Sequence, residues 1–288
     1  MLSKPECHDF VTNILGILNC FEKFKQDKRQ LVCNILHTFM HIEPFQTVHA
    51  INVSPGNRRL PLFKEIEDAM FKCQGGSCYS LNYFVRELLV TIGYDVRFVG
   101  CNAFGQRNFH LALIIRSLDE PGDIYLVDVG TSLPTWKIIP IDFKTVSPVY
   151  TQGFLHYQLK RKDDTTIEVF HKRNKPSELN TGQTNWYLYY EVCLTSVDIE
   201  DFAVNMEQLY VNPNYSSFPF LLEVRVVIFK NDRLFALKNK EFIYENDQKE
   251  LMKELVMTTS ELRHILLKYF PKIYSFNNNI LELIENPM

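Results

Sequence analysis

The sequence lacks a surplus of either charge, a long hydrophobic run and a basic leader. Its 31 Lys and Arg against 34 Asp and Glu give a net charge of -3 and a pI near 6.3. This balance argues against general binding to nucleic acid or anionic membranes, because both need a basic surplus. No apolar run reaches the ~18 residues of a membrane span, and no basic segment precedes an apolar core near the first residue. We therefore expect a cytoplasmic protein that binds neither nucleic acid nor membrane.

The seven cysteines show no Cys-x-x-Cys pair and no regular spacing. An odd number in such an arrangement argues against a disulfide scaffold and against a zinc site, so we expect no metal. Most of these thiols should be small buried groups. Internal repeats, heptads and low-complexity tracts are also missing. With 288 residues, 46% of them hydrophobic, the chain can bury a large core in two or three lobes.

Hydrophobic periodicity predicts a helical first part. Apolar residues recur at helical spacing over 31–40 and after Pro61. They recur again over 79–92, where Gly93 offers a left-handed C-terminal cap. These segments predict a lobe of helices that ends near residue 93.

Short β-like runs separated by turn residues follow. A helix is predicted at 198–210, strands at 221–230 and 233–244 flank an Asn231-Asp232 turn, and Thr258 with Glu261 forms a capping box. The polar stretch 172–184 is expected to be a surface loop. The middle lobe is therefore expected to be made of strands and the last lobe to be mixed. The predicted strands of the middle lobe are 95–101, 109–116, 124–129, 136–142, 153–160, 166–171 and 186–193.

One cysteine, Cys78, stands directly after a glycine turn and directly before a helical segment. The first turn of a helix carries unpaired N–H groups and about half a positive charge, which favours a thiolate. Gly75 and Gly76 allow the tight turn and keep Cβ atoms away from a reacting group. Asn82, one turn into the helix, is placed to anchor a nearby backbone group. Cys78 is therefore the candidate nucleophile.

Two polar residues interrupt apolar strands further along. Without a partner, a buried Asp128 carboxylate would cost several kcal/mol or take up a proton, and His110 lies in an equally apolar run. The turn-rich segment between the two strands predicts an antiparallel hairpin. A register that pairs Arg116 with Gly122 places His110 directly opposite Asp128, with Cβ atoms roughly 5 Å apart. A slip of one residue would separate the two side chains.

These residues predict a cysteine enzyme that transfers acyl groups. Asp128 would fix the tautomer of His110, His110 would take the proton of Cys78, and the thiolate would attack an acyl carbon to form a thioester. Backbone N–H groups at the head of the helix would bind the oxyanion. Singly, each residue is more often structural, and papain-type and transglutaminase-type enzymes share the Cys, His, Asp order. The other histidines are assigned to the core or the surface: His8, His37, His41, His49, His156, His171 and His264.

At these residues the chain resembles the arylamine N-acetyltransferase family. The family's R-G-G-x-C segment, with Asn four residues after the cysteine, is similar to 74–82. Its H-x-L-L strand resembles 110–113, its V-D-x-G strand end resembles 127–130, and its P-F-E-N segment resembles 44–47. Weaker similarity extends the resemblance over about residues 8–270.

The resemblance implies an α+β fold with three lobes around a cysteine-proteinase-like Cys-His-Asp core. A helical lobe (1–93) would carry the nucleophile, a central β-barrel lobe (94–195) would carry the histidine and aspartate, and an α/β lid (196–288) would follow. It also implies ping-pong transfer of an acetyl group from acetyl-CoA, through Cys78, to an aromatic amine, hydrazine or hydroxylamine.

The resemblance also places the ligands. The acceptor pocket is expected at Phe109 and Thr131. Coenzyme A is expected near Tyr215, Ser216 and Ser217.

The chain departs from the family pattern around the proposed site. Gln74 and Gln46 stand where the family has Arg and Glu, so we expect a neutral amide pair in place of an ion pair. Because both charges are replaced together, neither is left buried without its partner. Ser77 replaces an aromatic residue, and Thr131-Ser132 replaces Phe-Gly or Ser-Gly. Two alternatives therefore stay open: an amide synthase or an amide or thioester hydrolase on the same core, and a non-catalytic binding homologue.

Overall fold

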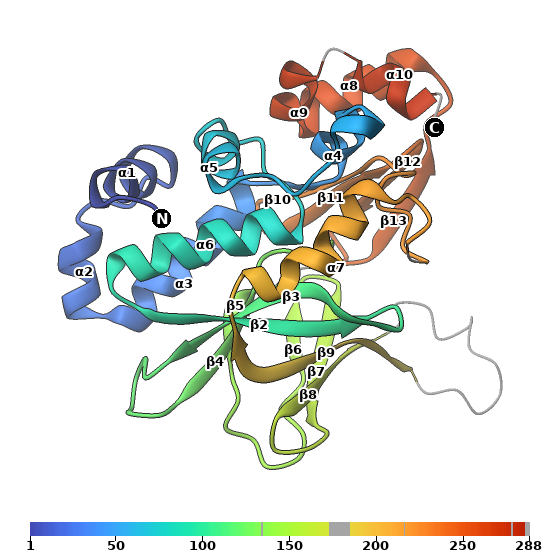
Figure 1. Cartoon of the computed structure of the whole chain (residues 1–288). Helices are drawn as coiled ribbons and strands as arrows, with labels where there is room; N and C mark the ends of the chain where they lie inside the picture. The colour runs from blue at the N-terminus through green and yellow to red at the C-terminus, as the bar shows by residue number, and fades with distance from the viewer. Residues whose placement is uncertain (134, 173–184, 216, 278, 286–288) are drawn as a thin grey trace.

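The computed structural model describes residues 1–133, 135–172, 185–215, 217–277 and 279–285. It confirms the α+β class: helices from the first third of the chain lie against a curled eight-stranded sheet, and a five-stranded sheet with the last helices lies beyond them (Figure 1). Most of the predicted surface loop, residues 173–184, lies outside the described residues. The α-helices are α1 (Lys4–Asp9), α2 (Cys20–Gln26), α3 (Lys28–Ile42), α4 (Val48–Asn52), α5 (Phe63–Phe71), α6 (Cys78–Ile92), α7 (Glu200–Val211), α8 (Thr259–Tyr269), α9 (Pro271–Phe276) and α10 (Ile280–Glu285).

The eight-stranded sheet has the order β5-β4-β3-β2-β9-β8-β7-β6, and all its neighbours are antiparallel. It curls without closing, so β5 and β6 are its edges. The strands predicted for the middle lobe all occur, with ends shifted by a few residues. They are β2 (Asp95–Ala103), β3 (Gln106–Arg116), β4 (Ile124–Asp128), β5 (Thr135–Pro140), β7 (Leu155–Arg161), β8 (Thr166–Lys172) and β9 (Trp186–Val197), and the short edge strand β6 (Tyr150–Gln152) was not predicted.

The five-stranded sheet corrects the prediction for the last lobe. The segment 233–244, expected to be one strand, is a hairpin, because Asn239 turns the chain with a φ of 48°. The first and last strands of this sheet were not predicted, and the first comes from the helical part of the chain. The order is β1 (Phe45–Gln46), β10 (Arg225–Lys230), β11 (Arg233–Lys238), β12 (Glu241–Glu245) and β13 (Leu251–Leu255).

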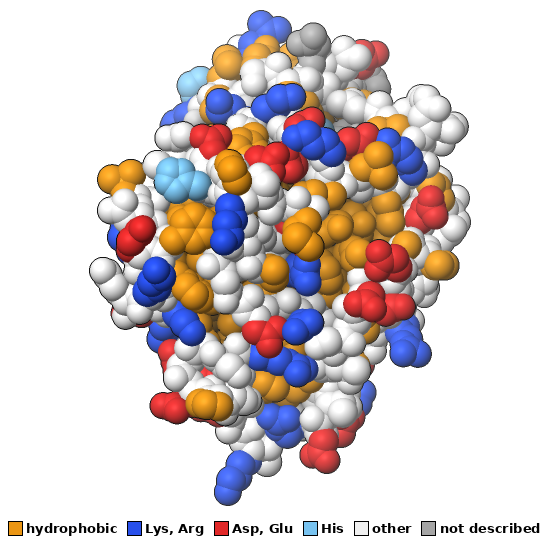
Figure 2. Space-filling view, turned by 60° about the vertical axis from the view of Figure 1, so that its left-hand side comes forward, with side chains coloured by type: hydrophobic (Ala, Val, Ile, Leu, Met, Phe, Trp, Pro, Cys, Tyr) orange, Lys and Arg blue, Asp and Glu red, His pale blue; other side chains and the backbone are white. Residues whose placement is uncertain are grey.

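Two hydrophobic cores hold these layers. The larger core joins α3, α5, α6 and α7 to the curled sheet. The smaller core joins four helices (α4, α8, α9 and α10) to the five-stranded sheet. On the face shown in Figure 2, hydrophobic side chains gather at mid-height while Lys, Arg, Asp and Glu are interspersed around them. Within the described ranges, no helix combines the length and the apolar character needed to cross a bilayer.

Candidate active site

The glycine turn before Cys78 is fixed by the backbone of a segment some thirty residues earlier. The N–H of Gly76 donates to Pro44 O (3.1 Å), and the N–H of Gln46 donates to Gly76 O (2.9 Å). The N–H of Gly75 donates to Glu43 Oε2 (2.9 Å), and burial raises the pKa of this carboxyl well above its usual value. The turn is therefore held mainly by backbone pairing and one buried acid.

The expected side-chain amide pair between Gln46 and Gln74 is wrong. Gln46 Nε2 donates to the backbone carbonyl of Gln74 (3.3 Å), and Gln46 Oε1 accepts from the N–H of His49 (2.9 Å). The amide of Gln46 is buried, whereas the side chain of Gln74 is partly exposed. One glutamine therefore bridges two backbone segments, which a pairing of side-chain types alone could not reveal.

Two glycines permit close backbone approaches at the site. Gly75 has a φ of 62°, and a Cβ there would lie 1.8 Å from Pro44 O. A Cβ on Gly130, at the end of β4, would lie 2.8 Å from the Cα of Cys78 and 2.3 Å from Asn82 Nδ2. Real Cβ atoms do not approach backbone so closely, so the end of β4 can meet the start of α6 only because residue 130 is glycine.

His110 and Asp128 meet, but not in the predicted register. Arg116 pairs with Ile124 instead of Gly122, so the hairpin is shifted by two residues and His110 is not directly opposite Asp128. An even shift keeps both side chains on one face of the sheet. The His110 Nε2 and Asp128 Oδ2 atoms are 2.9 Å apart, and both residues are buried. The expected contact is present although the predicted pairing was wrong.

Four donors surround the Asp128 carboxylate. Oδ2 accepts from His110 and from the Tyr190 hydroxyl (2.7 Å), and Oδ1 accepts from Asn82 Nδ2 (3.1 Å) and the Gly130 N–H (3.0 Å). Burial alone raises the pKa of Asp128, but the charge and hydrogen bond of His110, with the other donors, bring the pKa below its usual value. Asp128 is therefore held as a carboxylate.

Asn82 ties the helix to the same strands. Its Nδ2 also donates to Leu111 O (2.6 Å), and its Oδ1 accepts from the N–H of Val129 (3.2 Å). The predicted anchoring of backbone groups is thus present, and the contact with Asp128 adds to it.

His110 links Asp128 to the sulfur of Cys78. Burial lowers the pKa of His110, but the charge and hydrogen bond of Asp128 and the hydrogen bond with Cys78 raise it to about 10. The imidazole therefore carries a proton at neutral pH. All three residues expected to carry the chemistry lie together, one from α6 and two from neighbouring strands.

The start of α6 keeps its N–H groups free of a side-chain cap. Ser77 is the N-cap residue, yet its hydroxyl bonds to the Tyr210 hydroxyl and makes no capping bond. The first intrahelical bond runs from the N–H of Leu81 to Ser77 O. The N–H groups in the turn that begins at Cys78 thus have no intrahelical acceptor, and such groups at a helix start favour an anion.

Cys78 and His110 open into a cavity of about 320 Å³. Aromatic rings form much of its wall: Phe104 lies with its ring centre 5.3 Å from Phe109 and 5.4 Å from Phe218. Arg225 is the only Arg or Lys among its described lining residues, and its guanidinium pairs with Glu223. The cavity suits a small, flat, largely apolar molecule.

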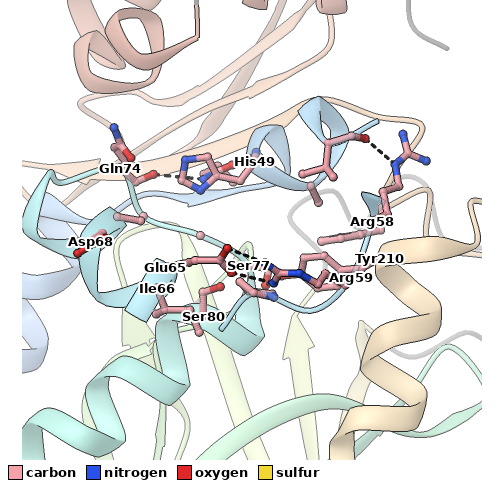
Figure 3. A pocket seen from close by; sticks show the side chains of 18 of the residues that line it. His49, Arg58, Arg59, Glu65, Ile66, Asp68, Gln74, Ser77, Ser80 and Tyr210 are labelled. Atoms are coloured by element: carbon pink, nitrogen blue, oxygen red, sulfur yellow. Dashed lines mark hydrogen bonds and ion pairs between the residues drawn. The ribbon is translucent and has the colours of Figure 1, made fainter. Parts of the chain in front are cut away.

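A second, larger hollow adjoins this cavity. The groove has a volume of about 960 Å³ and shares Ser77, Tyr210 and Phe220 with the cavity. Arg58, on the loop after α4, and Lys72, at the end of α5, lie in its wall. Figure 3 shows the groove, in which the side chain of Arg59 reaches Glu65 in a two-pronged ion pair.

The predicted ligand residues fall in different places. Phe109 and Thr131 both line the cavity, and so does Ser217. Tyr215 does not line it, and its hydroxyl lies 3.5 Å from Asn205 Oδ1. Ser216 lies outside the described residues.

The sequence did not reveal most of the residues that line the cavity, or that the Tyr190 hydroxyl donates a hydrogen bond to Asp128. The strand predicted at 186–193 contains Tyr189 and Tyr190, but alternation along a strand does not say which hydroxyl reaches a carboxylate. Phe218 follows the predicted coenzyme A residues directly, and its position there was the available signal. The missed lining residues include Phe104, Tyr189, Tyr190, Met206, Leu209, Tyr210, Phe218 and Phe220.

Both a family model and solved structures match this chain. A family model described as N-acetyltransferase matches residues 52–273, and no curated protein gives a significant match. Among solved structures, Mycobacterium marinum arylamine N-acetyltransferase in complex with CoA superposes with a TM-score of 0.75 at 14% identity, over 95% of this chain and 96% of that one. The Mycobacterium abscessus arylamine N-acetyltransferase has a TM-score of 0.72 at 14% identity, over 97% of this chain and 95% of that one. The Salmonella typhimurium arylamine N-acetyltransferase has a TM-score of 0.65 at 16% identity, over 84% of this chain and 82% of that one.

These identities are low, while the family match covers most of the chain and the fold matches nearly end to end. The chain is an acyltransferase that belongs, as a divergent member, to the arylamine N-acetyltransferase family.

Proposed function

We propose that the protein moves an acetyl group from acetyl-CoA, through a thioester on Cys78, to the nitrogen of an arylamine, arylhydrazine or related small amine. The observation that carries this proposal is the hydrogen-bonded series of Cys78, His110 and Asp128 at an aromatic cavity. The three-lobe division at residues 93 and 195 belongs to the same proposal, with β1 and α4 contributed by the first lobe to the last sheet and its core.

Turnover would have two halves. With its proton held by His110, the Cys78 sulfur attacks the acetyl carbonyl. The carbon–sulfur bond to coenzyme A breaks, and His110 gives its proton to the departing thiolate. The amine then attacks the Cys78 thioester, its proton passes to His110, and the carbon–sulfur bond to Cys78 breaks to restore the starting pair. N–H groups at the start of α6 would bind the oxyanion in both halves.

The cavity supports a small aromatic acceptor. Its volume lies at the lower end of typical ligand pockets. The rings of Phe104 and Phe218 both meet Phe109 edge to face, and this cluster favours another flat ring. We assign Phe109 and Thr131 to acceptor contacts on this basis.

The donor needs more room and charge than the cavity offers. Its acyl end must reach Cys78, so Ser217 is the member of the expected coenzyme A set best placed to touch it. The adjoining groove offers space and the cations Arg58 and Lys72 for phosphate groups. We place the nucleotide there, with the connecting arm passing Ser77 and Tyr210. Contacts of Tyr215 and Ser216 with the donor stay a prediction.

Mass spectrometry after incubation with acetyl-CoA tests the nucleophile. We expect one acetyl group on Cys78, its loss on addition of an arylamine, and no adduct in Cys78→Ala. Cys193→Ala, which removes another partly exposed thiol, is the matched control and should be acetylated normally. Failure of acetyl-, propionyl- and malonyl-CoA alike to modify the protein would overturn the proposal in favour of a non-catalytic homologue, and an adduct lost only to water would favour a hydrolase.

Donor placement is tested by comparing acetyl-CoA with S-acetylpantetheine, which lacks the nucleotide. Lys72→Glu and Arg58→Glu should slow acylation by acetyl-CoA about 10-fold or more, the scale of one charged hydrogen bond, and leave acylation by S-acetylpantetheine unchanged. Lys25→Glu, an exposed cation on α2, is the control. Normal acylation by acetyl-CoA in both groove variants would exclude the groove as the nucleotide site.

A further inference from the structure

Three metal-ligating side chains converge on the surface where α3 meets the turn between β10 and β11. His37 and His41 lie one turn apart on α3, so both imidazoles project from one side of the helix. Asp232 lies in the two-residue turn that follows β10. One nitrogen from each histidine and one carboxylate oxygen lie within 4.8 Å of one another.

The geometry points to a binding site for a divalent first-row transition metal ion, which we propose as a property separate from acyl transfer. His37 Nε2 lies 2.7 Å and His41 Nε2 lies 2.9 Å from the same oxygen, Asp232 Oδ1. Two imidazoles and a carboxylate are ligands that suit Zn²⁺, Co²⁺, Ni²⁺ or Cu²⁺ better than Mg²⁺ or Ca²⁺.

The orientation of His41 supports a metal. Its Nδ1 lies 2.6 Å from the backbone carbonyl of His37, so Nδ1 carries the proton and Nε2 is an acceptor, which takes the backbone N–H of Asp232 (3.2 Å) and would exchange this hydrogen bond for the ion. A hydrogen bond of this kind on the far nitrogen is the usual outer support of a metal-ligating histidine. The backbone thus holds Nε2 in the form that a metal requires.

The elements that carry the three ligands are packed together and joined to a tight turn. α3 packs against β10, and residues 231 and 232 both adopt positive φ angles, 51° and 60°, which is typical of a tight hairpin turn. A tetrahedral ion with bonds of about 2.0–2.1 Å separates its ligand atoms by about 3.3 Å. The separations of 2.7 Å, 2.9 Å and at most 4.8 Å among the three ligand atoms bracket this spacing, and the exposed side chains of His37 and Asp232 leave water to complete the coordination.

Titration with Co²⁺ and Zn²⁺ tests the site. The protein carries the Cys78→Ala substitution, so that the reactive thiol cannot bind the ion. We expect one Co²⁺ per chain, with a visible spectrum of nitrogen and oxygen ligation and no thiolate charge-transfer band, displaced by Zn²⁺. Removal of a ligand in His37→Ala, His41→Ala or Asp232→Asn should weaken binding at least about 10-fold, a loss that even an outer partner can cause.

The controls separate a site from adventitious binding. His264→Ala removes an exposed histidine on α8 and should leave the titration unchanged. Asp232→Asn keeps a residue that accepts the left-handed turn, so a folding defect cannot explain its loss of binding. Equal titrations for the parent and all three ligand variants, or a spectrum dominated by thiolate bands, would overturn the proposal.

Discussion

Tyr190→Phe removes one donor from the buried Asp128 carboxylate and changes nothing else in shape. The hydroxyl of Tyr190 donates to Asp128 Oδ2 at 2.7 Å, and both residues are buried. A hydrogen bond to a charged group contributes about 1.5–3 kcal/mol, so we expect the free energy of unfolding to fall by that amount at pH 7. A chain of this size loses about 2 °C of Tm per kcal/mol, so the expected drop is about 3–6 °C.

Tyr157→Phe is the matched control in the same sheet. Tyr157 is fully buried on β7, and its hydroxyl has no hydrogen-bond partner among the described residues. Deletion of this hydroxyl removes an unsatisfied polar group, so the variant should be as stable as the parent protein or more stable. The difference between the two variants isolates the charged hydrogen bond from the loss of a phenol.

The pH dependence gives the refuting measurement. The native pKa of Asp128 is lowered, so the stability from its donors is present above the unfolded value of about 3.9 and is lost as pH falls through the native value. The difference in free energy of unfolding between Tyr190→Phe and the parent protein, measured in urea, should therefore become smaller below about pH 4. Equal stability of parent and Tyr190→Phe at pH 7, or a gap that persists unchanged below pH 4, would refute the account.

Three further predictions concern the same site. Asn82→Ala should cost about 2–4 kcal/mol in urea unfolding, because it leaves buried backbone groups and a carboxylate oxygen short of partners. Gly130→Ala should cost about 1–3 kcal/mol by overpacking and slow acetylation of Cys78 about 100-fold by displacing it, while Gly56→Ala, whose Cβ meets nothing within 4 Å, should match the parent. Because the pKa of His110 is raised, its contribution to the free energy of unfolding is fully present below about pH 6.5 and is lost as pH rises through about 10. The free energy of unfolding of His110→Gln, measured in urea, should lack this decline. Identical pH profiles for His110→Gln and the parent protein would contradict the assignment.

The fold was predictable where periodicity was strong and hidden where contacts were distant. α6 begins at Cys78 and ends before Gly93, as the sequence predicts, because an apolar stripe and a glycine cap define it locally. β1 is only two residues long and exists because it pairs with β10, nearly two hundred residues later. No local pattern reports such a pairing.

The hairpin that carries the histidine and the aspartate shows how a partly wrong prediction can reach the right contact. The turn is closed between Ser117 and Asp123, whose carboxylate accepts N–H groups of three residues within the turn. This loop is longer than the one assumed, so strand pairing starts two residues later. Because side chains alternate with a period of two, the shift preserved the face and with it the contact of His110 with Asp128.

Three of the departures from the family pattern line the groove, and Thr131 and Ser132 line the cavity. Gln46 and Gln74 line the groove, and Ser77 lines both the groove and the cavity, whereas the groups around Asp128 satisfy both of its oxygens. The turn keeps its shape without an ion pair because backbone bonds and Glu43 hold it. A small Ser77 in turn leaves room for the Tyr210 hydroxyl between the two hollows. If the proposed function holds, we therefore expect this family member to differ from others in donor or acceptor choice and not in the contacts of His110 and Asp128.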